Sequence, residues 1–243
     1  MSVECTVRDK GGSVIVALTG RLRLPDVAPV QLQLNKCLAE QPDAVLVDLS
    51  RMTVGEPLAL SVFVAVGRQA ALWPGTPVLL CAADGPTRGL LSGIAFHRVP
   101  LFRTVRAACE HARASRRIRP TLRDEILPLP GAPRFARNLA TEACLRWELP
   151  HLVAPASLIT SELVSNVVDH ANTMATLAFS LHRRHLTISV RDGSLAEPVP
   201  PSDQPLPPRV MSGRGLMIVQ ATADSWGWLP AESGKVVWAT LSR

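Results

Sequence analysis

The chain has 243 residues, of which 47% are hydrophobic, and a formal net charge of +6 at pH 7. This length suits two domains that each bury a core, and the apolar content excludes a disordered protein. The five cysteines stand singly, without a Cys-x-x-Cys pair, which argues against a zinc site or a disulfide framework. The first ten residues lack the apolar segment of a signal peptide, and the longest apolar run, 58–66, is too short to span a bilayer. We therefore expect a cytoplasmic protein without a membrane partner.

The first part of the chain, residues 1–115, alternates between apolar strands and helical stretches. The predicted strands are 14–20, 44–50, 76–82 and 99–102, and the predicted helices between them are 25–40, 57–73 and 85–94. Such alternation predicts an α/β domain with a mostly parallel sheet and helices packed over it. No glycine-rich phosphate loop follows any of these strands, which argues against a nucleotide site in this half.

A basic segment, 111–123, carries much of the positive charge, and we place a junction between two domains at 116–124. Aromatic residues for stacking on bases are scarce, and no groove-reading motif is present. These features argue against a nucleic-acid partner and favour a solvated junction or a patch that meets an acidic protein. A DNA-binding regulator is the least favoured alternative.

The second part, residues 125–243, follows a different pattern. The predicted order is two helices, two hairpin strands, a loop, a helix and two closing strands. Their ranges are 131–147, 154–171, 173–182, 185–192, 193–215, 215–224, 224–230 and 235–241. It predicts an α+β domain with helices on one face of a mixed, largely antiparallel sheet. Six prolines between 198 and 208 exclude a helix or a central strand there, and loops of this length are typical of lids and binding loops.

The predicted helix 154–171 has an unusual polar face. On a helical wheel of about 100° per residue, Glu162, Asn166, Asp169 and His170 fall on one side, and Leu and Val fill the other. A merely solvated face usually carries Lys or Arg, and this one has none. Carboxylate and amide oxygens one turn apart suit Mg2+, and a neighbouring acid could act as a general base. A core helix with a solvated outer face is the alternative.

Two shorter motifs accompany this helix. Asp192 ends a predicted strand and Gly193 follows it, and 213–216 reads Gly-Arg-Gly-Leu directly before a helix. Backbone N–H groups and the dipole at such a helix start can hold phosphate. Each motif alone is common in turns and caps, but their order and their separation by the proline-rich loop make the combination specific.

Together these segments resemble the ATP-binding domain shared by gyrase, histidine kinases and the bacterial anti-sigma factor serine kinases, over residues 125–243. The resemblance implies that Asn166 coordinates Mg2+ at the phosphates of ATP and that Glu162 acts as general base or positions the attacking group. It places Asp169 and His170 of the same motif among the cofactor-binding residues.

The same resemblance assigns the remaining binding residues. Asp192 would accept a hydrogen bond from the adenine amino group, and Gly193 would allow close approach. The residues Gly213, Arg214, Gly215 and Leu216 would wrap the phosphates. The closing stretch 234–240, which ends at Thr240, is similar to the strand behind the adenine pocket. The usual Asp-x-Gly-x-Gly motif is here Asp-Gly-Ser-Leu-Ala, a departure that weakens the expected adenine contacts.

Residues 1–115 resemble the STAS domain, the fold of anti-anti-sigma factors. The stretches 18–22, Leu-Thr-Gly-Arg-Leu, and 47–50, Val-Asp-Leu-Ser, carry the similarity. The phosphorylated loop, usually Asp-Ser-Ser-Gly, is here 56–59, Glu-Pro-Leu-Ala, so the acceptor serine is absent. The STAS-like domain is in this respect degenerate.

The resemblance as a whole implies a fusion that binds ATP and Mg2+ and regulates a partner-switching pathway. One hypothesis is a serine/threonine kinase that acts on a separate STAS-domain anti-anti-sigma protein. The other is a non-catalytic, ATP-dependent binding module whose STAS-like half docks on an ATP-binding domain. A sigma factor and a second copy of the chain are the other expected partners.

Overall fold

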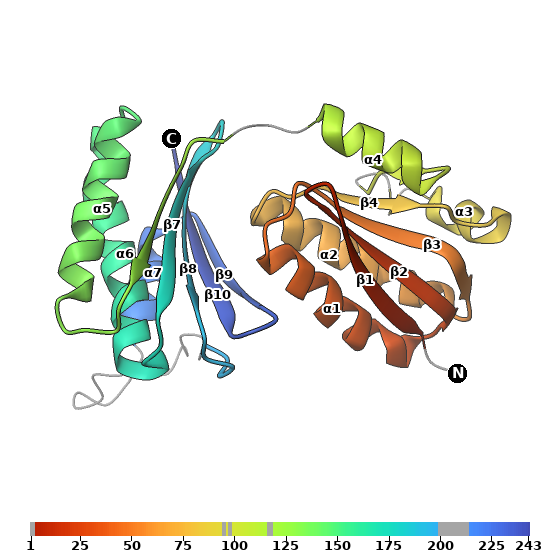
Figure 1. Cartoon of the computed structure of the whole chain (residues 1–243), viewed down its shortest axis with the longest axis horizontal. Helices are drawn as coiled ribbons and strands as arrows, with labels where there is room; N and C mark the ends of the chain where they lie inside the picture. Colours follow the sequence, from red (N-terminus) through yellow and green to blue (C-terminus); the bar gives the residue numbers. More distant parts are fainter. Residues whose placement is uncertain (1–2, 94–95, 97–98, 116–118, 199–213) are drawn as a thin grey trace. The chain divides into compact units, whose positions relative to one another are not determined.

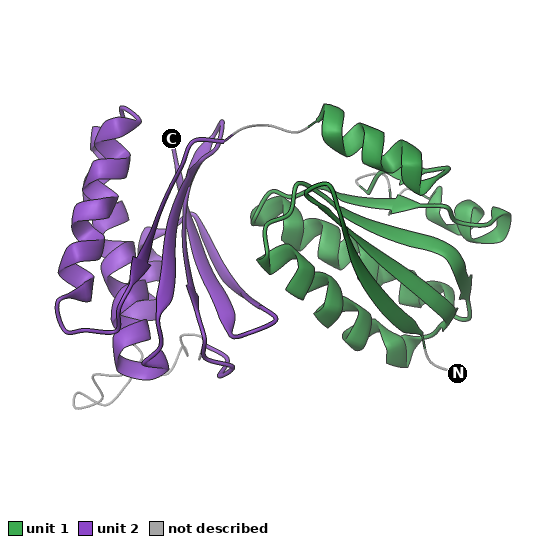
Figure 2. Cartoon of the chain, viewed as in Figure 1, with its two compact units in different colours: residues 1–117 green, residues 118–243 purple. Residues whose placement is uncertain are grey.

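The computed structural model describes residues 3–93, 96, 99–115, 119–198 and 214–243. The chain divides into two compact units, Met1–Arg117 and Ile118–Arg243 (Figure 2). None of the helices within the described ranges has the length and apolar character that a membrane crossing requires.

The first unit is built on a five-stranded sheet with the order β1-β2-β3-β4-β5 (Figure 1). Its strands are β1 (Glu4–Lys10), β2 (Ser13–Leu22), β3 (Val45–Val54), β4 (Val78–Cys81) and β5 (Leu101–Phe102). Only the pairing of β1 with β2 is antiparallel; the other neighbours run parallel. All four residues of β4 are buried, as expected for a parallel strand covered on both faces. The predicted mostly parallel α/β fold is confirmed.

Helices connect these strands. They are η1 (Leu24–Asp26), α1 (Val27–Ala39), η2 (Pro57–Leu60), α2 (Ser61–Leu72), α3 (Gly85–Leu91) and α4 (Val105–Ala114). Asp84 caps α3 by accepting a hydrogen bond from the Thr87 N–H at 2.8 Å. Such a cap satisfies one of the free N–H groups of a helix start. The stretch 56–59, without an acceptor serine, lies at the 3-10 turn before α2.

The strand β1 was not predicted from the sequence. Its side chains are almost all exposed, so it shows none of the apolar alternation by which strands are recognised. A two-residue turn joins it to β2, with φ of 60° at Gly11 and 86° at Gly12. Positive φ at both positions is typical of the tight hairpin turns that match strand twist.

The second unit is built on a five-stranded sheet with the order β6-β7-β8-β10-β9, and all its neighbours pair antiparallel. The strands are β6 (Thr121–Ile126), β7 (Ala175–Leu181), β8 (His185–Asp192), β9 (Ser225–Pro230) and β10 (Lys235–Ser242). The helices are α5 (Ala132–Arg146), η4 (Pro150–Leu152), α6 (Val153–Asn166), the π-helical turn η5 (Val167–Ala171) and α7 (Arg214–Thr222). The helices α5, α6 and α7 lie on one face of the sheet (Figure 1). The predicted α+β arrangement is confirmed.

The sheet of the second unit begins inside the expected junction. Residues 121–124 were assigned to the junction 116–124, but they lie in β6, which pairs with β7 along its whole length. This edge strand could not be recognised from its charged sequence, because it is held by hydrogen bonds to β7 and not by apolar side chains. The expected proline-rich lid falls largely on residues 199–213, outside the described residues.

The core of the second unit lies between the helices and the sheet. Ala136, Ala140 and Ala143 of α5 are fully buried, and their small side chains form one helix face that packs closely. From α6, Ile159 and Leu163 enter the same cluster, and from β8 every second residue does so. This packing fixes the rotation of α6 about its axis and thereby the direction of its polar side.

Candidate functional site

The polar side of α6 faces the first turn of α7. Glu162 and Asn166 are half-buried and lie one turn apart, while Ile159, Leu163 and Val164 hold the opposite side in the core. The polar pair is therefore partly shielded from solvent but is not part of the apolar core. The alternative of a core helix with a solvated outer face therefore stays open.

Gly215, in the first turn of α7, touches both side chains. A β-carbon at this position would lie 2.9 Å from Glu162 Oε2 and 3.3 Å from Asn166 Oδ1. Any residue other than glycine would therefore push against the two polar groups. The fold thus brings together Glu162, Asn166 and Gly215, which the sequence assigned to one site although they come from segments far apart in the chain.

This arrangement places two side-chain oxygens beside the start of a helix. The first N–H groups of α7 have no partners within the helix, and the helix dipole makes this end positive. A carboxylate oxygen and an amide oxygen stand directly beside that end. Such a combination can hold a phosphate group together with a hard divalent cation.

Other residues of the phosphate motif have different positions. Arg214 is the first residue of α7, while Gly213 lies outside the described residues. Leu216 is only 7% exposed and belongs to the hydrophobic core. Its side chain stabilises the packing of α7, so only its backbone can contribute to a phosphate site.

Asp169 and His170 do not continue the α-helical face. They lie in η5, where the Asn172 N–H donates to the Val167 carbonyl at 2.8 Å, five residues earlier. The widened turn ends the α-helical register after Asn166, so positions calculated for an α-helix no longer hold. Both side chains are exposed, and no hydrogen bond or ion pair links either to Glu162 or Asn166 within the described ranges. A π-helical turn is rare and often marks a functional site.

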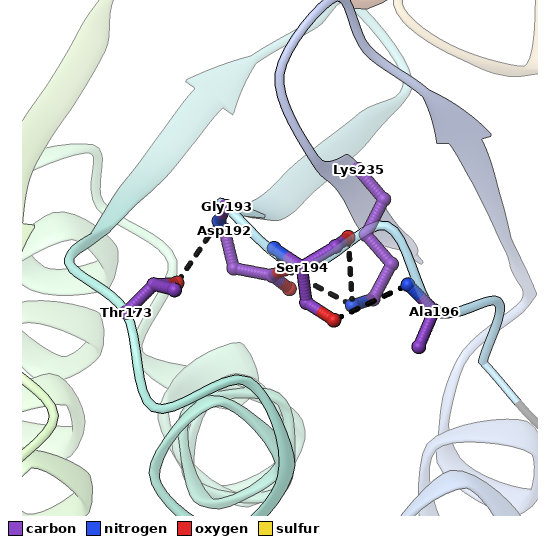
Figure 3. A network of polar contacts seen from close by, with 6 residues as sticks. All are labelled: Thr173, Asp192, Gly193, Ser194, Ala196 and Lys235. Atoms are coloured by element: carbon purple, nitrogen blue, oxygen red, sulfur yellow. Dashed lines mark hydrogen bonds and ion pairs between the residues drawn. The ribbon is translucent and has the colours of Figure 1, made fainter.

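Asp192 forms the centre of a second polar group (Figure 3). Its side chain is only 5% exposed, and its Oδ1 accepts hydrogen bonds from the Ser194 N–H at 2.8 Å and from Lys235 Nζ at 3.0 Å. Lys235 Nζ also donates to the Ser194 carbonyl at 3.4 Å. A buried charge is tolerated only when it is paired and hydrogen-bonded, and here both conditions hold.

Two glycines shape the backbone around Asp192. The Gly193 N–H donates to Thr173 Oγ1 at 2.9 Å, and a β-carbon at 193 would lie 3.3 Å from Thr173 Cγ2. Gly234 has a φ of 95°, and a β-carbon there would collide with the Asp192 carbonyl oxygen. Only glycine combines this conformation with this close approach. The neighbour of Gly193 in the structure is Thr173, and the approach of adenine expected there stays a prediction. Gly234 was not singled out from the sequence.

Thr240 lies away from this group. It pairs with Thr187 in the middle of the sheet, and its Oγ1 donates to the Ser225 carbonyl at 3.3 Å. The residue of β10 directly opposite Asp192 is Lys235. Sequence reasoning missed Lys235, although its position right after Gly234 at the start of the closing strand was the available signal.

One known protein family is similar to the second part of the chain. Residues 129–241 match the model of the histidine kinase-like ATPase domain, which confirms the resemblance of the second part of the chain. No curated protein is similar enough to this chain to count as a match.

Solved structures of anti-sigma factor antagonists are among those similar to part of the chain. An anti-sigma factor antagonist from Mycobacterium paratuberculosis is 23% identical, with 46% of this chain and 95% of that chain covered and a TM-score of 0.41. The anti-sigma factor antagonist SpoIIAA in its unphosphorylated form is 12% identical, with 46% and 97% covered and a TM-score of 0.39. A candidate anti-sigma factor antagonist from Thermotoga maritima is 16% identical, with 45% and 94% covered and a TM-score of 0.40.

Proposed function

We propose that this chain, whose residues 129–241 form a histidine kinase-like ATPase domain, binds ATP with Mg2+ and transfers the terminal phosphoryl group to a serine or threonine of a partner protein. The observation that carries the proposal is the approach of Glu162 and Asn166 to the backbone of Gly215. The residues proposed to bind the metal, to accept the proton and to hold the phosphates would then meet at one point.

The residues at this point fit the proposed ligands. Mg2+ usually keeps several waters and takes one or two protein oxygens plus phosphate oxygens. Asn166 Oδ1 would be such a protein ligand, and the start of α7 would hold the phosphates. Within the described ranges no group of three or more His, Cys, Asp or Glu could hold a metal. The proposed Mg2+ would therefore be held by Asn166 and the phosphates, and not by a cluster of such side chains. When bound, Mg2+ neutralises charge on the phosphates.

Glu162 would act on the incoming hydroxyl group. Its Oε2 lies beside the same backbone as Asn166 Oδ1, so an acceptor hydroxyl near the terminal phosphate would be within its reach. The carboxylate would orient that hydroxyl and accept its proton. Asp192 would accept a hydrogen bond from the base, through the oxygen that Lys235 and Ser194 do not use.

The proposed partner follows from the resemblance of the second unit to anti-sigma factor kinases. It is a STAS-domain anti-anti-sigma protein, with a sigma factor or a second copy of the chain as further candidates. The chain's own stretch 56–59 has no acceptor serine, so the substrate would be a separate protein. A chain that binds ATP and acts on such a partner would work in the cytoplasm.

A non-catalytic, ATP-dependent binding module is the second candidate function. The sequence Asp-Gly-Ser-Leu-Ala after the strand β8 favours it, because it departs from the usual Asp-x-Gly-x-Gly motif. In this case the first unit would dock on an ATP-binding domain, and no phosphate would be transferred.

The test is phosphoryl transfer from labelled ATP to candidate STAS proteins, with the Glu162→Gln variant. This substitution keeps size and polarity but removes basicity, so transfer should fall on the order of 10²-fold while ATP affinity stays close to wild type. Glu142→Gln on the exposed surface of α5 is the matched control. If the wild type and Glu162→Gln both bind ATP and neither transfers phosphate, the chain is the non-catalytic binding module.

A further inference from the structure

The Asp192–Lys235 pair offers one free hydrogen-bond acceptor and one free donor. Both side chains are largely buried, at 5% and 12% exposure, and they lie directly opposite each other on β8 and β10. Oδ1 of Asp192 is used by Ser194 and Lys235, while Oδ2 has no donor within the part of the chain that the structure describes. The Lys235 ammonium has three N–H donors, of which two go to Asp192 and to the Ser194 carbonyl.

A lone carboxylate at a base site distinguishes the two purines. Adenine carries an amino group at position 6, which donates, and guanine carries a carbonyl oxygen there, which accepts. A carboxylate alone accepts from the adenine amino group but repels the guanine oxygen. The guanine oxygen would be buried without a partner, and such a group costs more than the bond it replaces.

The ammonium of Lys235 changes this discrimination. It stands 3.0 Å from the carboxylate, so whatever lies at position 6 of the base meets an acceptor and a donor side by side. An amino group can donate to Oδ2 of Asp192. A carbonyl oxygen can accept the remaining N–H of Lys235, whose positive charge also offsets the repulsion from the carboxylate.

We propose that Lys235 is a specificity-determining residue that makes the base site tolerant of a 6-oxo purine, so that the site takes GTP as well as ATP. The inference rests on the proposed nucleotide function and on Asp192 as the residue that meets position 6. It assigns Lys235 a direct contact with the base of GTP, and it assigns the pair a role beyond holding β8 against β10.

The experiment is competition of GTP and of ATP against labelled ATP, with Mg2+, on the full chain. Wild type should bind GTP within about tenfold of ATP. Lys235→Met keeps the length of the side chain but has no donor, so it should weaken GTP at least about tenfold more than ATP. Lys10→Met is the matched control, because Lys10 is exposed on β1 of the other unit, and it should leave both affinities unchanged.

Thermal unfolding of each variant accompanies the binding measurements, because removal of Lys235 leaves Asp192 without its partner. If Lys235→Met does not fold, Lys235→Arg, which keeps a cationic donor, should still bind GTP, and the wild-type competition stands by itself. The inference is wrong if the wild type binds GTP more than about a hundredfold more weakly than ATP. It is also wrong if Lys235→Met lowers the affinities for GTP and ATP equally. Failure of the wild type to bind either nucleotide would instead overturn the proposed nucleotide site.

Discussion

Substitution of Gly215 by alanine should separate stability from nucleotide binding. Its φ is not in the left-handed region, so alanine can adopt the backbone conformation. The added β-carbon would lie 2.9 Å from Glu162 Oε2 and 3.3 Å from Asn166 Oδ1, closer than carbon and oxygen normally approach. Both atoms are ends of flexible side chains, so we expect them to move away while the helices stay in place.

The two effects have opposite signs and can be estimated. Alanine in a helix is more favourable than glycine by about 0.5–1 kcal/mol, so the free energy of unfolding should be unchanged or slightly higher. Displacement of the Asn166 oxygen should remove one interaction with a charged group, worth about 1.5–3 kcal/mol. Affinity for ATP and Mg2+ should therefore fall by about ten- to a hundredfold.

Isothermal titration calorimetry with ATP and Mg2+, combined with thermal unfolding, measures both quantities. Gly89→Ala is the matched control, because Gly89 lies inside α3 and a β-carbon there meets nothing within 4 Å. It should leave affinity unchanged. Wild-type affinity in Gly215→Ala would refute the assignment of Glu162 and Asn166 to a site at the start of α7.

Three further outcomes are expected. Asn166→Ala should lower the affinity for ATP with Mg2+ while the fold survives, because the buried side of α6 is untouched, and calorimetry with and without Mg2+ checks this. Burial and the charges of His185 and Arg119 lower the pKa of His182 to about 4. Between the ordinary pKa of histidine, about 6.5, and this value, the unfolded chain binds more protons than the folded chain. The free energy of unfolding should therefore fall as the pH drops from about 6.5 to 4. The variant His182→Gln should flatten this pH dependence in thermal unfolding. A STAS-directed kinase should leave residues 53–61 unmodified, and phosphate mapped by mass spectrometry to Thr53 or Ser61 would show that this loop is still an acceptor.

The sequence alone determined the elements that bury apolar side chains. The strands β2, β3 and β4 and the helices α5 and α6 carry the apolar periodicity of their structure, because each must cover a hydrophobic core. The polar stretch of α6 was also readable, since Glu162 and Asn166 lie one turn apart in any α-helix. These local patterns depend on neighbours along the chain and need no knowledge of the fold.

Only the tertiary structure decided the edge strands, the strand register and the contacts between helices, because these do not depend on neighbours along the chain. The strands β1 and β6 are charged and mostly exposed, so only their hydrogen-bonded neighbours show that they are strands. The pairing register of β8 with β10 places Lys235, and not Thr240, opposite Asp192. A shift of register changes every such pair, and the register is set by the packing of the whole sheet. The contact of Gly215 with Glu162 and Asn166 likewise exists only because α6 and α7 pack on the same face of that sheet.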